Sequence, residues 1–208
     1  MTQSKNNPHP YIIGVTGITG SGTSTVSNIL KTHGGFVISA DRLAHEVMAP
    51  GENAYAAIVA HFGEGILTPQ GEIHRKALGQ LVFGNPQQLA ALEGMIHPHV
   101  IAKTLAHLRQ NFQGAFAVLD APLLIEAGMH TICNQVWLVT ASDATRIQRI
   151  MARDGIDAHT ATRRLNSRKG DDFLRPFAHE VLVNEGSIDT LRPVVAQLID
   201  QKKKEKHI

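Results

Sequence analysis

Short runs of consecutive apolar residues alternate with amphipathic stretches along most of the chain. Such dense runs are typical of parallel strands that are covered on both faces of a sheet. Strands are expected at residues 11–16, 36–39, 116–119, 136–140 and 181–183. Because stretches of helical periodicity separate these runs, the pattern predicts an α/β fold with a largely parallel sheet.

Two regions between the expected strands carry helical patterns. Residues 63–113 contain no run typical of a strand and are expected to form successive helices. Breaks between these helices are expected at Gly71, at Gly84-Asn85-Pro86 and at His97-Pro98. Residues 142–177 form a second helical region, which is rich in arginine, and a last helix is expected at 187–201.

The composition narrows the class of protein. A length of 208 residues suits one compact domain with a small appendage, and a net charge of +2 does not favour nucleic acid as a partner. The N-terminus lacks the apolar stretch of a signal peptide, and no apolar run is long enough for a membrane span. The single cysteine, Cys133, excludes an intramolecular disulfide and suits a small core residue. We therefore expect a cytoplasmic protein that binds no membrane.

A glycine-rich segment connects the first expected strand to a helix expected at residues 24–32. Its residues are Gly17-Ile18-Thr19-Gly20-Ser21-Gly22-Thr23-Ser24-Thr25. Glycines allow tight turns that aim successive amides inward, and the helix directs its positive end to the same point. Ser24 occupies the position whose hydroxyl ligates Mg²⁺ between the β- and γ-phosphates. This segment, called the phosphate loop below, is expected to bind ATP with Mg²⁺; the alternative is a glycine-rich turn without function.

The phosphate loop departs from the usual pattern at one position. The pattern places a lysine directly before the hydroxyl residue, where its charge contacts the β- and γ-phosphates. Thr23 stands there instead and supplies a neutral hydrogen bond, whereas a charge-assisted bond is roughly twice as strong. Thr23 is kept as a candidate for ATP binding and catalysis. Binding through amides and Mg²⁺ is expected to survive, but phosphoryl transfer needs another cation.

Three later segments make the pattern more specific. They are 38–41 (ISAD) with Glu46-Val47 and Pro50-Gly51, 71–78 (GEIHRKAL) with Val82-Phe83 and Ile96-His97-Pro98, and 118–128 (VLDAPLLIEAG). Together with the phosphate loop, and in this order, they resemble the dephospho-CoA kinase family as far as Asn184-Glu185-Gly186. The resemblance covers nearly all of the chain after residue 11. It implies transfer of the γ-phosphate of ATP to the 3′-hydroxyl of dephospho-CoA, which completes coenzyme A synthesis.

The resemblance also implies a division of the chain. The family is similar to nucleoside-monophosphate kinases, with a P-loop NTPase-type parallel sheet flanked by helices, a helical acceptor-binding insertion and a helical lid. The nucleotide-binding core is expected at residues 11–62, 114–141 and 179–201. The acceptor-binding domain is expected at 63–113 and the lid at 142–178. Residues 1–10 and 202–208 are expected to be flexible termini.

Two aspartates follow expected strands, where a parallel sheet presents residues to ligands. The resemblance makes Asp41 the candidate general base, which would contact the acceptor hydroxyl and accept its proton. The alternative for Asp41 is the N-cap of a helix at 42–48. Asp120 is expected at the substrate site, in contact with Mg²⁺ near Ser24, and the alternative is a cap of the next turn.

Further substrate contacts are implied by the resemblance. Arg75 and His97 match family positions in the helical insertion and are expected to line the acceptor site, while His97 also suits a structural histidine before a proline. Leu123 is expected at the substrate site, where it would shape and pack the turn after the third strand. Glu126 is expected either to contact the acceptor or to form a surface ion pair.

Arginines concentrate in the expected lid. The candidates for ATP are Arg146, Arg149, Arg153 and Arg164. Arg149 and Arg153 are four residues apart on one helical face, a spacing that suits phosphate oxygens, so both are expected to bind ATP and Arg149 to act in catalysis. The alternative is pairing with acids such as Asp143 and Asp154. Asn184 lies in the family's adenine-binding turn and is expected to contact the base or the turn.

Three more positions depart from the family pattern. His74 and His179 replace aspartates, and Arg168 replaces a glutamine. One hypothesis is that Arg168 compensates for Thr23 from the lid. Besides an active dephospho-CoA kinase, the sequence leaves open a related kinase for another nucleotide acceptor. It also leaves open a catalytically silent paralogue that binds nucleotide or a CoA precursor.

Overall fold

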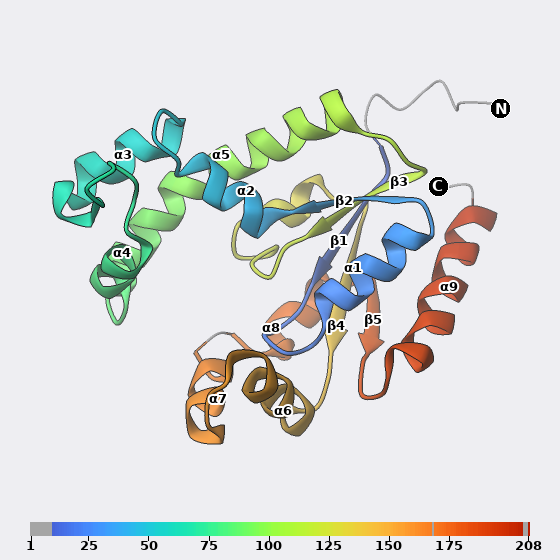
Figure 1. Ribbon diagram of the computed structural model, residues 1–208. Helices are drawn as coiled ribbons and strands as arrows, with labels where there is room; N and C mark the ends of the chain where they lie inside the picture. Colours follow the sequence, from blue (N-terminus) through green and yellow to red (C-terminus); the bar gives the residue numbers. More distant parts are fainter. Residues whose placement is uncertain (1–9, 168, 206–207) are drawn as a thin grey trace. The chain divides into compact units, whose positions relative to one another are not determined.

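The computed structural model of the protein describes residues 10–167, 169–205 and 208. The chain forms two compact units (Figure 1). The sheet unit comprises Met1–Ile38 and Asn111–Ile208, and the helical unit comprises Ser39–Gln110. Within the described residues, no helix combines the length and the apolar character needed to cross a lipid bilayer.

A five-stranded sheet with the strand order β2-β3-β1-β4-β5 forms the sheet unit's centre. The strands are β1 (Ile12–Thr16), β2 (Gly35–Ser39), β3 (Phe116–Asp120), β4 (Gln135–Thr140) and β5 (Glu180–Val183). β1 pairs in parallel with both β3 and β4, and β4 pairs in parallel with β5. The predicted α/β fold is therefore confirmed, and a strand is present at each predicted place.

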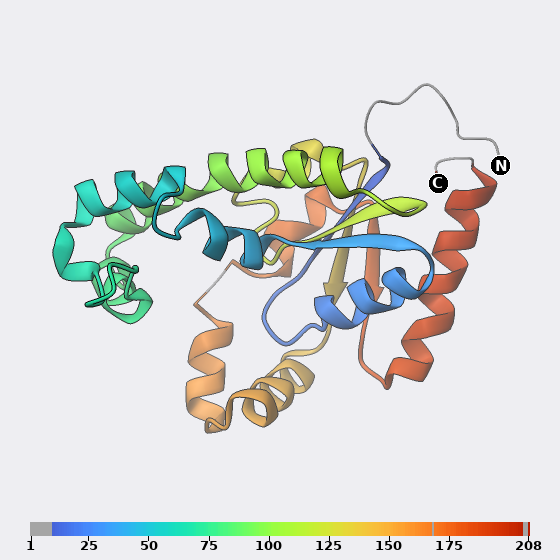
Figure 2. The same cartoon turned by 45° about the horizontal axis from the view of Figure 1, so that its top comes forward.

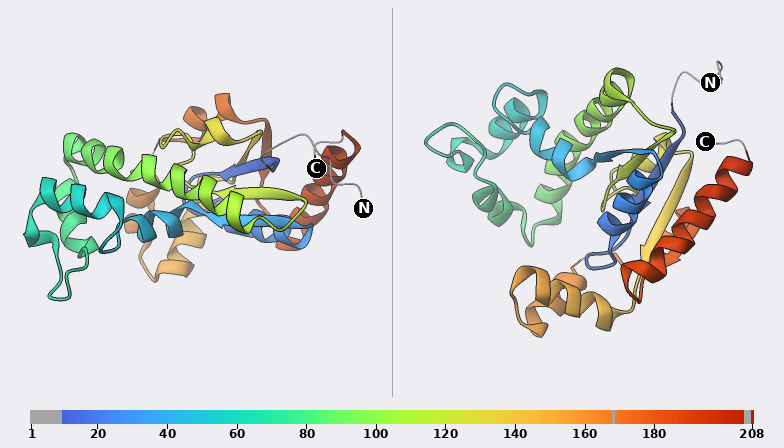
Figure 3. Two further views of the ribbon diagram at one scale, coloured as in Figure 1. Left: turned by 90° about the horizontal axis from the view of Figure 1, so that it is seen from above. Right: turned by 45° about the vertical axis from the view of Figure 1, so that its right-hand side comes forward.

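Helices α1 (Thr23–Thr32) and α9 (Ile188–Lys204) lie side by side over one face of the sheet (Figures 2 and 3). Val26, Ile29 and Leu30 form the apolar face of α1, as the sequence predicts. They share one buried cluster with Ile13, Val15, Phe116, Val118, Trp137, Val139, Leu182, Leu191, Val195 and Ile199. This packing fixes the N-terminus of α1 directly after the carboxyl end of β1.

The last helix is longer than its sequence predicts. α9 continues past residue 201 to Lys204, so the start of the expected flexible terminus is helical. Lys202 is only 5% exposed, and its Nζ lies 3.3 Å from both Glu180 Oε1 and Glu205 Oε2. Two carboxylates around a buried ammonium compensate for its desolvation, which explains why this lysine-rich end stays folded.

The arginine-rich region forms α6 (Asp143–Asp154), α7 (Ala158–Leu165) and α8 (Asp171–Leu174), followed by the 3₁₀ helix η3 (Arg175–Phe177). Another 3₁₀ helix, η2 (Met129–Ile132), precedes β4. Ser142 and Asp157 cap α6 and α7 through their side chains, and Gly155 ends α6 with a φ of 64°. The local capping residues therefore delimit these helices. Arg168 lies outside the described residues.

The helical unit contains α2 (Ala40–Val47), α3 (Asn53–Phe62), η1 (Glu64–Ile66), α4 (Arg75–Val82) and most of α5 (Pro86–Asn111). Lys103 of α5 joins the start of the unit through Nζ contacts of 3.6 Å to Glu46 Oε2 and 2.9 Å to Glu52 Oε1. The compact unit therefore includes α2 and α3 in addition to most of the predicted insertion at 63–113.

The predicted break at His97-Pro98 is wrong, because α5 runs through Pro98 without interruption. A proline inside a helix removes one backbone hydrogen bond and crowds the carbonyl four residues earlier, here that of Gly94. The rest of the 26-residue helix stays intact, with Val100, Thr104 and Leu108 buried after the proline. Tertiary packing over these residues outweighs the local cost of the proline.

Candidate active site

The phosphate loop runs from β1 into α1, and its glycines are required by geometry. Gly20 and Gly22 have φ values of 86° and 95°, a region that favours glycine. A Cβ on Gly17 would lie 2.3 Å from the carbonyl oxygen of Val139. A Cβ on Gly22 would lie 2.3 Å from Asn184 Nδ2. The backbone of the loop therefore lies directly against β4 and the segment after β5.

Three amides at the end of this loop remain free for a ligand. Within the described part of the chain, the N–H groups of Gly22, Thr23 and Ser24 have no acceptor. They lie at the N-terminus of a ten-residue helix, where the helix dipole favours negative charge. Gly22, the N-cap, brings no side chain that could occupy these donors. The loop is therefore built to bind an anion such as a nucleotide's phosphates.

The hydroxyl residues of the loop have different surroundings. Ser24 is exposed, so its hydroxyl is accessible to a ligand. Thr23 is half-buried, with its Cγ2 3.2 Å from the point that a Cβ on Gly17 would occupy. Ser21 is buried, and its Oγ has no hydrogen-bond partner among the described residues. Thr25 donates its N–H to the Gly22 carbonyl at 3.0 Å, which closes the first turn of α1.

Arg149 and Asn184 bind the outer side of the loop. Arg149 Nη1 lies 3.3 Å from the carbonyl oxygen of Gly20 and 3.4 Å from that of Ser21. Asn184 Nδ2 donates to the Ser21 carbonyl at 2.8 Å. Arg149 Nη2 also donates to Asn184 Oδ1 at 3.5 Å and to the Gly186 carbonyl at 3.4 Å. The structure therefore brings two predicted site residues together at the phosphate loop.

The other predicted lid arginines bind carboxylates. Arg146 is 4% exposed and pairs with Asp171, with Asp143 at 3.3 Å and with the Thr140 hydroxyl at 2.7 Å. Arg153 lies 2.7 Å from Asp154, and Arg164 contacts the same carboxyl group. Hydrogen bonding from Arg153 lowers the pKa of Asp154. These pairs match the alternative that the sequence offers for lid arginines, and ATP binding by Arg153 stays a prediction.

Glu185 has a structural role that the sequence does not indicate. Its carboxylate accepts from the Ser142 N–H, from the Ser142 hydroxyl at 3.0 Å and from the Thr145 hydroxyl at 2.8 Å. Hydrogen bonding, above all from Thr145, lowers the pKa of Glu185. Glu185 therefore ties the start of α6, the helix that carries Arg149, to the turn that carries Asn184.

Asp120 and the phosphate loop lie at the same edge of the sheet. Asp120 ends β3 and is in register with Val15 of β1, which leads into the loop. Its carboxylate and the exposed hydroxyl of Ser24 are oxygen donors of the kind that Mg²⁺ prefers. The described residues contain no group of three or more His, Cys, Asp or Glu side chains that could hold a metal ion. A magnesium ion at this edge would therefore need ligands from a bound nucleotide in addition to the oxygens of Ser24 and Asp120.

The turn after β3 contains Leu123 and Glu126. Leu123 is half-buried, while its neighbour Leu124 is fully buried and packs directly over Gly14 of β1. Glu126 Oε2 is buried and has no hydrogen-bond partner among the described residues. No ion pair among residues 10–167, 169–205 and 208 involves Glu126, so the structure gives no support to a surface ion pair. The substrate contacts of both residues stay predictions.

Asp41 lies in the first turn of α2, in the helical unit. The alternative of an N-cap is wrong, because Ser39 caps the helix and its Oγ accepts from the Arg42 N–H at 3.3 Å. Asp41 is exposed, and the cap hydrogen bond is made by Ser39 and not by the Asp41 carboxylate. Its candidate role as general base stays a prediction.

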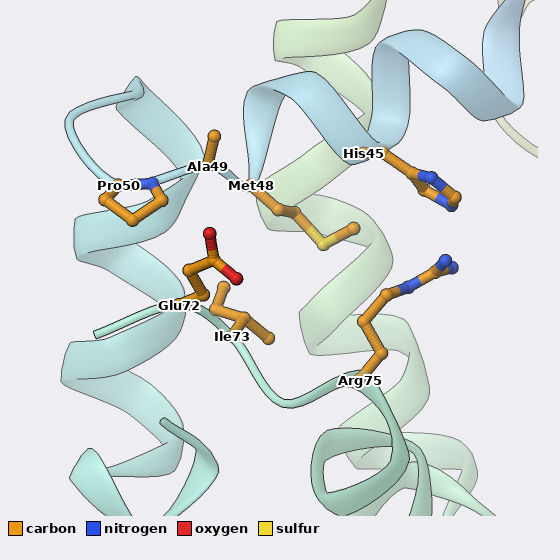
Figure 4. Close-up of a pocket in the computed structure, with 7 residues that line it drawn as sticks. All are labelled: His45, Met48, Ala49, Pro50, Glu72, Ile73 and Arg75. Carbon is orange, nitrogen blue, oxygen red and sulfur yellow. The ribbon is translucent and has the colours of Figure 1, made fainter. Parts of the chain in front are cut away.

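A pocket of about 220 Å³ opens beside the same helix (Figure 4). It is lined by His45, Met48, Ala49, Pro50, Glu72, Ile73 and Arg75. The Arg75 guanidinium and the His45 ring extend toward the same side of the pocket. Asp41, His45 and Met48 are spaced at i, i+4 and i+7, which places them along one face of α2. That spacing is the sequence signal that marks His45 as a further candidate beside Asp41.

His97 lies on α5, is half-buried and is not among the residues that line this pocket. Its contact with the acceptor stays a prediction, as does its structural alternative. His74 is exposed and occupies the N-cap position of α4, where its side chain makes no cap hydrogen bond. His179 joins two strands, because its N–H donates to the Val136 carbonyl at 2.8 Å and its Nδ1 accepts from the Val136 N–H at 3.1 Å. His179 therefore has a structural place at the start of β5.

Comparison with known proteins agrees with this geometry. The family model for dephospho-CoA kinase matches residues 11–190. The dephospho-CoA kinase of Geobacter metallireducens is 42% identical over 190 residues, which cover 89% of this chain and 94% of the relative. That of Moorella thermoacetica is 39% identical over 188 residues, or 89% of each chain.

Solved structures agree as well. A crystal structure from Thermus thermophilus has a TM-score of 0.77 at 34% identity and covers 92% of this chain and 98% of its own. The dephospho-CoA kinase from Campylobacter jejuni has a TM-score of 0.65 at 27% identity and covers 95% and 98%. The match extends over the phosphate loop, the helical unit and the region of α6 to α8. The chain therefore belongs to the dephospho-CoA kinase family.

Proposed function

We propose that this protein transfers the γ-phosphate of ATP to the 3′-hydroxyl of dephospho-CoA, forming CoA and ADP in the cytoplasm. The observation that carries the proposal is the phosphate loop, whose free amides at the N-terminus of α1 suit the phosphates of ATP. Family membership identifies the reaction as an ATP-dependent phosphorylation. The family relatives are named for the same substrate.

The loop contributes to transfer mainly through position and charge. In phosphoryl transfer, negative charge spreads over the oxygens of the transferred group, so fixed donors lower the barrier without covalent chemistry. The amides of Gly22, Thr23 and Ser24 supply such donors, and Arg149 adds a positive charge at the loop. Ser24 and Asp120 would hold Mg²⁺, which neutralises charge between the β- and γ-phosphates when bound.

The acceptor is assigned to the face of α2 that carries Asp41. Asp41 would orient the ribose hydroxyl and accept its proton, and its exposed carboxylate is available for that contact. His45 and Arg75 line the adjoining pocket and make no ion pair among the described residues, so both are available for an anionic group of dephospho-CoA. Met48 and Ile73 give the same pocket an apolar wall.

The proposal is tested by incubating the purified protein with Mg-ATP and dephospho-CoA and identifying the product by mass. Formation of CoA with release of ADP is expected, and Ser24→Ala is the matched variant with reduced turnover. Binding of ATP by calorimetry without any CoA would instead identify a silent paralogue. Phosphate transfer to another nucleotide, but not to dephospho-CoA, would identify a different kinase.

Arg75→Ala is expected to raise the KM for dephospho-CoA about 10- to 100-fold, because a hydrogen bond to a charged group contributes roughly 1.5–3 kcal/mol. The Kd for Mg-ATP is expected to stay unchanged, since the nucleotide-binding amides belong to the sheet unit. Steady-state kinetics and calorimetry measure the two constants. Lys76→Ala is the control, because Lys76 is the neighbouring cation on α4 and does not line the pocket. An equal effect of both variants would contradict a specific role for Arg75.

A further inference from the structure

Asn184 is buried against the phosphate loop although it lies 163 residues away in the chain. Asn184 as a whole is only 6% exposed. Nδ2 donates to the Ser21 carbonyl at 2.8 Å, and the backbone N–H donates to the Thr140 carbonyl at 2.7 Å. The backbone of Asn184 is therefore anchored to the end of β4, while its carboxamide holds the phosphate loop.

The bond to Ser21 fixes the direction of a neighbouring amide. In a planar trans peptide, the carbonyl and the N–H of the next residue point in opposite directions. Because the Ser21 carbonyl is turned toward Asn184, the Gly22 N–H is turned away from it. That N–H is one of the three amides without an acceptor in the described chain. Asn184 thus controls a phosphate-binding donor without occupying it.

Two neighbours support this arrangement. Arg149 Nη1 makes a second contact to the Ser21 carbonyl at 3.4 Å, and its Nη2 holds Asn184 Oδ1 at 3.5 Å. Gly22 allows the close approach, since any Cβ there would lie 2.3 Å from Asn184 Nδ2. With both ends of its carboxamide bonded inside the protein, Asn184 is placed to act on the loop rather than on a base.

We propose that Asn184 is a positioning residue, which holds the Ser21–Gly22 peptide so that the Gly22 amide faces the phosphates. The proposal rests on the proposed ATP-dependent function and deepens it. Thr23 brings no charge to the loop, so phosphate affinity depends on the direction of the amides more than in a loop with lysine. Loss of Asn184 therefore weakens binding of any polyphosphate, whatever base it carries.

The test compares Mg-ATP with Mg-tripolyphosphate, which has the phosphates but no base, by calorimetry. Asn184→Leu, which keeps the approximate shape and removes the donor, is expected to raise both Kd values by the same factor of about ten. A rise for ATP alone would show a base contact and overturn the proposal, as would unchanged Kd values for both. Asn184→Ala, which leaves space instead of an apolar group, gives the same readout if the leucine variant does not fold.

Asn134→Leu is the matched control. Asn134 Oδ1 accepts from the Ile12 N–H at 2.7 Å, so this variant also removes an asparagine bond to the backbone, but away from the loop. It is expected to lower the unfolding temperature and leave both Kd values unchanged, and an equal loss of affinity would reduce Asn184 to a structural role. These binding measurements require no turnover. A protein that binds ATP yet forms no CoA would therefore contradict the kinase proposal, while the Asn184 test would remain valid.

Discussion

Replacing Asp41 with asparagine is expected to lower kcat about 100- to 10,000-fold, the range that a positioned general base contributes. Asparagine keeps the size of the side chain but cannot accept the proton of the acceptor hydroxyl. The Kd for Mg-ATP is expected to stay unchanged, because the phosphate-binding amides do not depend on this carboxylate. Single-turnover kinetics with saturating dephospho-CoA measure the chemical step directly.

Stability has to be separated from catalysis in this experiment, since Asp41 also lies in the first turn of α2. A carboxylate there interacts favourably with the helix dipole by about 0.3–1 kcal/mol. Ser39→Ala is the control, because it removes the cap bond to the Arg42 N–H and costs about 1 kcal/mol of stability, yet leaves the carboxylate in place. If Ser39→Ala lost as much turnover as Asp41→Asn, the base assignment would be wrong.

The second large effect concerns the charge that Thr23 does not supply. Arg149→Ala is expected to lower kcat/KM for ATP about 100- to 1,000-fold, the cost of removing a donor that stabilises transition-state charge. In the structure, Arg146 is bonded to Asp143 and Asp171, and Arg153 and Arg164 share Asp154. Arg149 instead bonds to carbonyl and amide oxygens at the loop, so its positive charge is the better placed to replace that of a lysine.

A double-mutant cycle with Thr23→Lys tests this replacement. Thr23→Lys alone is expected to raise kcat about 10- to 100-fold, because a charge-assisted bond replaces a neutral one. In the Thr23→Lys background, Arg149→Ala is expected to lower kcat/KM for ATP much less than in the natural protein. The reason is that the lysine and the arginine would stabilise the same negative charge in the transition state. An equal cost in both backgrounds would show that Arg149 does not compensate for the missing lysine.

Two further variants make the cycle specific. Arg163→Ala removes an exposed arginine of α7 and is expected to have no effect in either background. Arg168→Ala tests the hypothesis that the sequence suggests for compensation. Coupling of Thr23→Lys to Arg168 rather than to Arg149 would assign the replacement charge to Arg168.

The sequence predicted the elements whose causes are local. Each strand follows from a dense apolar run, and the α1 face of Val26, Ile29 and Leu30 follows from helical spacing. The glycines and hydroxyls of the phosphate loop were identified together because their function requires them to be adjacent. Local rules failed where tertiary contacts outweighed them, as at Pro98 within α5 and at the buried Lys202 in α9. At α2 the helix begins at Ala40, earlier than expected, so that Ser39 and not Asp41 is the cap.

Contacts between distant segments were decided by the tertiary structure alone. The sequence marked Arg149 and Asn184 as candidates for ATP, but their bonds to the Ser21 carbonyl span 128 and 163 residues. No periodicity encodes such a contact, because it depends on the parallel pairing that brings the ends of β1, β4 and β5 to one edge. In the same way, His45 and Arg75 line one pocket although they lie on different helices and far apart in the chain. The sequence by itself thus determined the fold class and the phosphate loop, whereas the tertiary structure determined which distant side chains orient that loop.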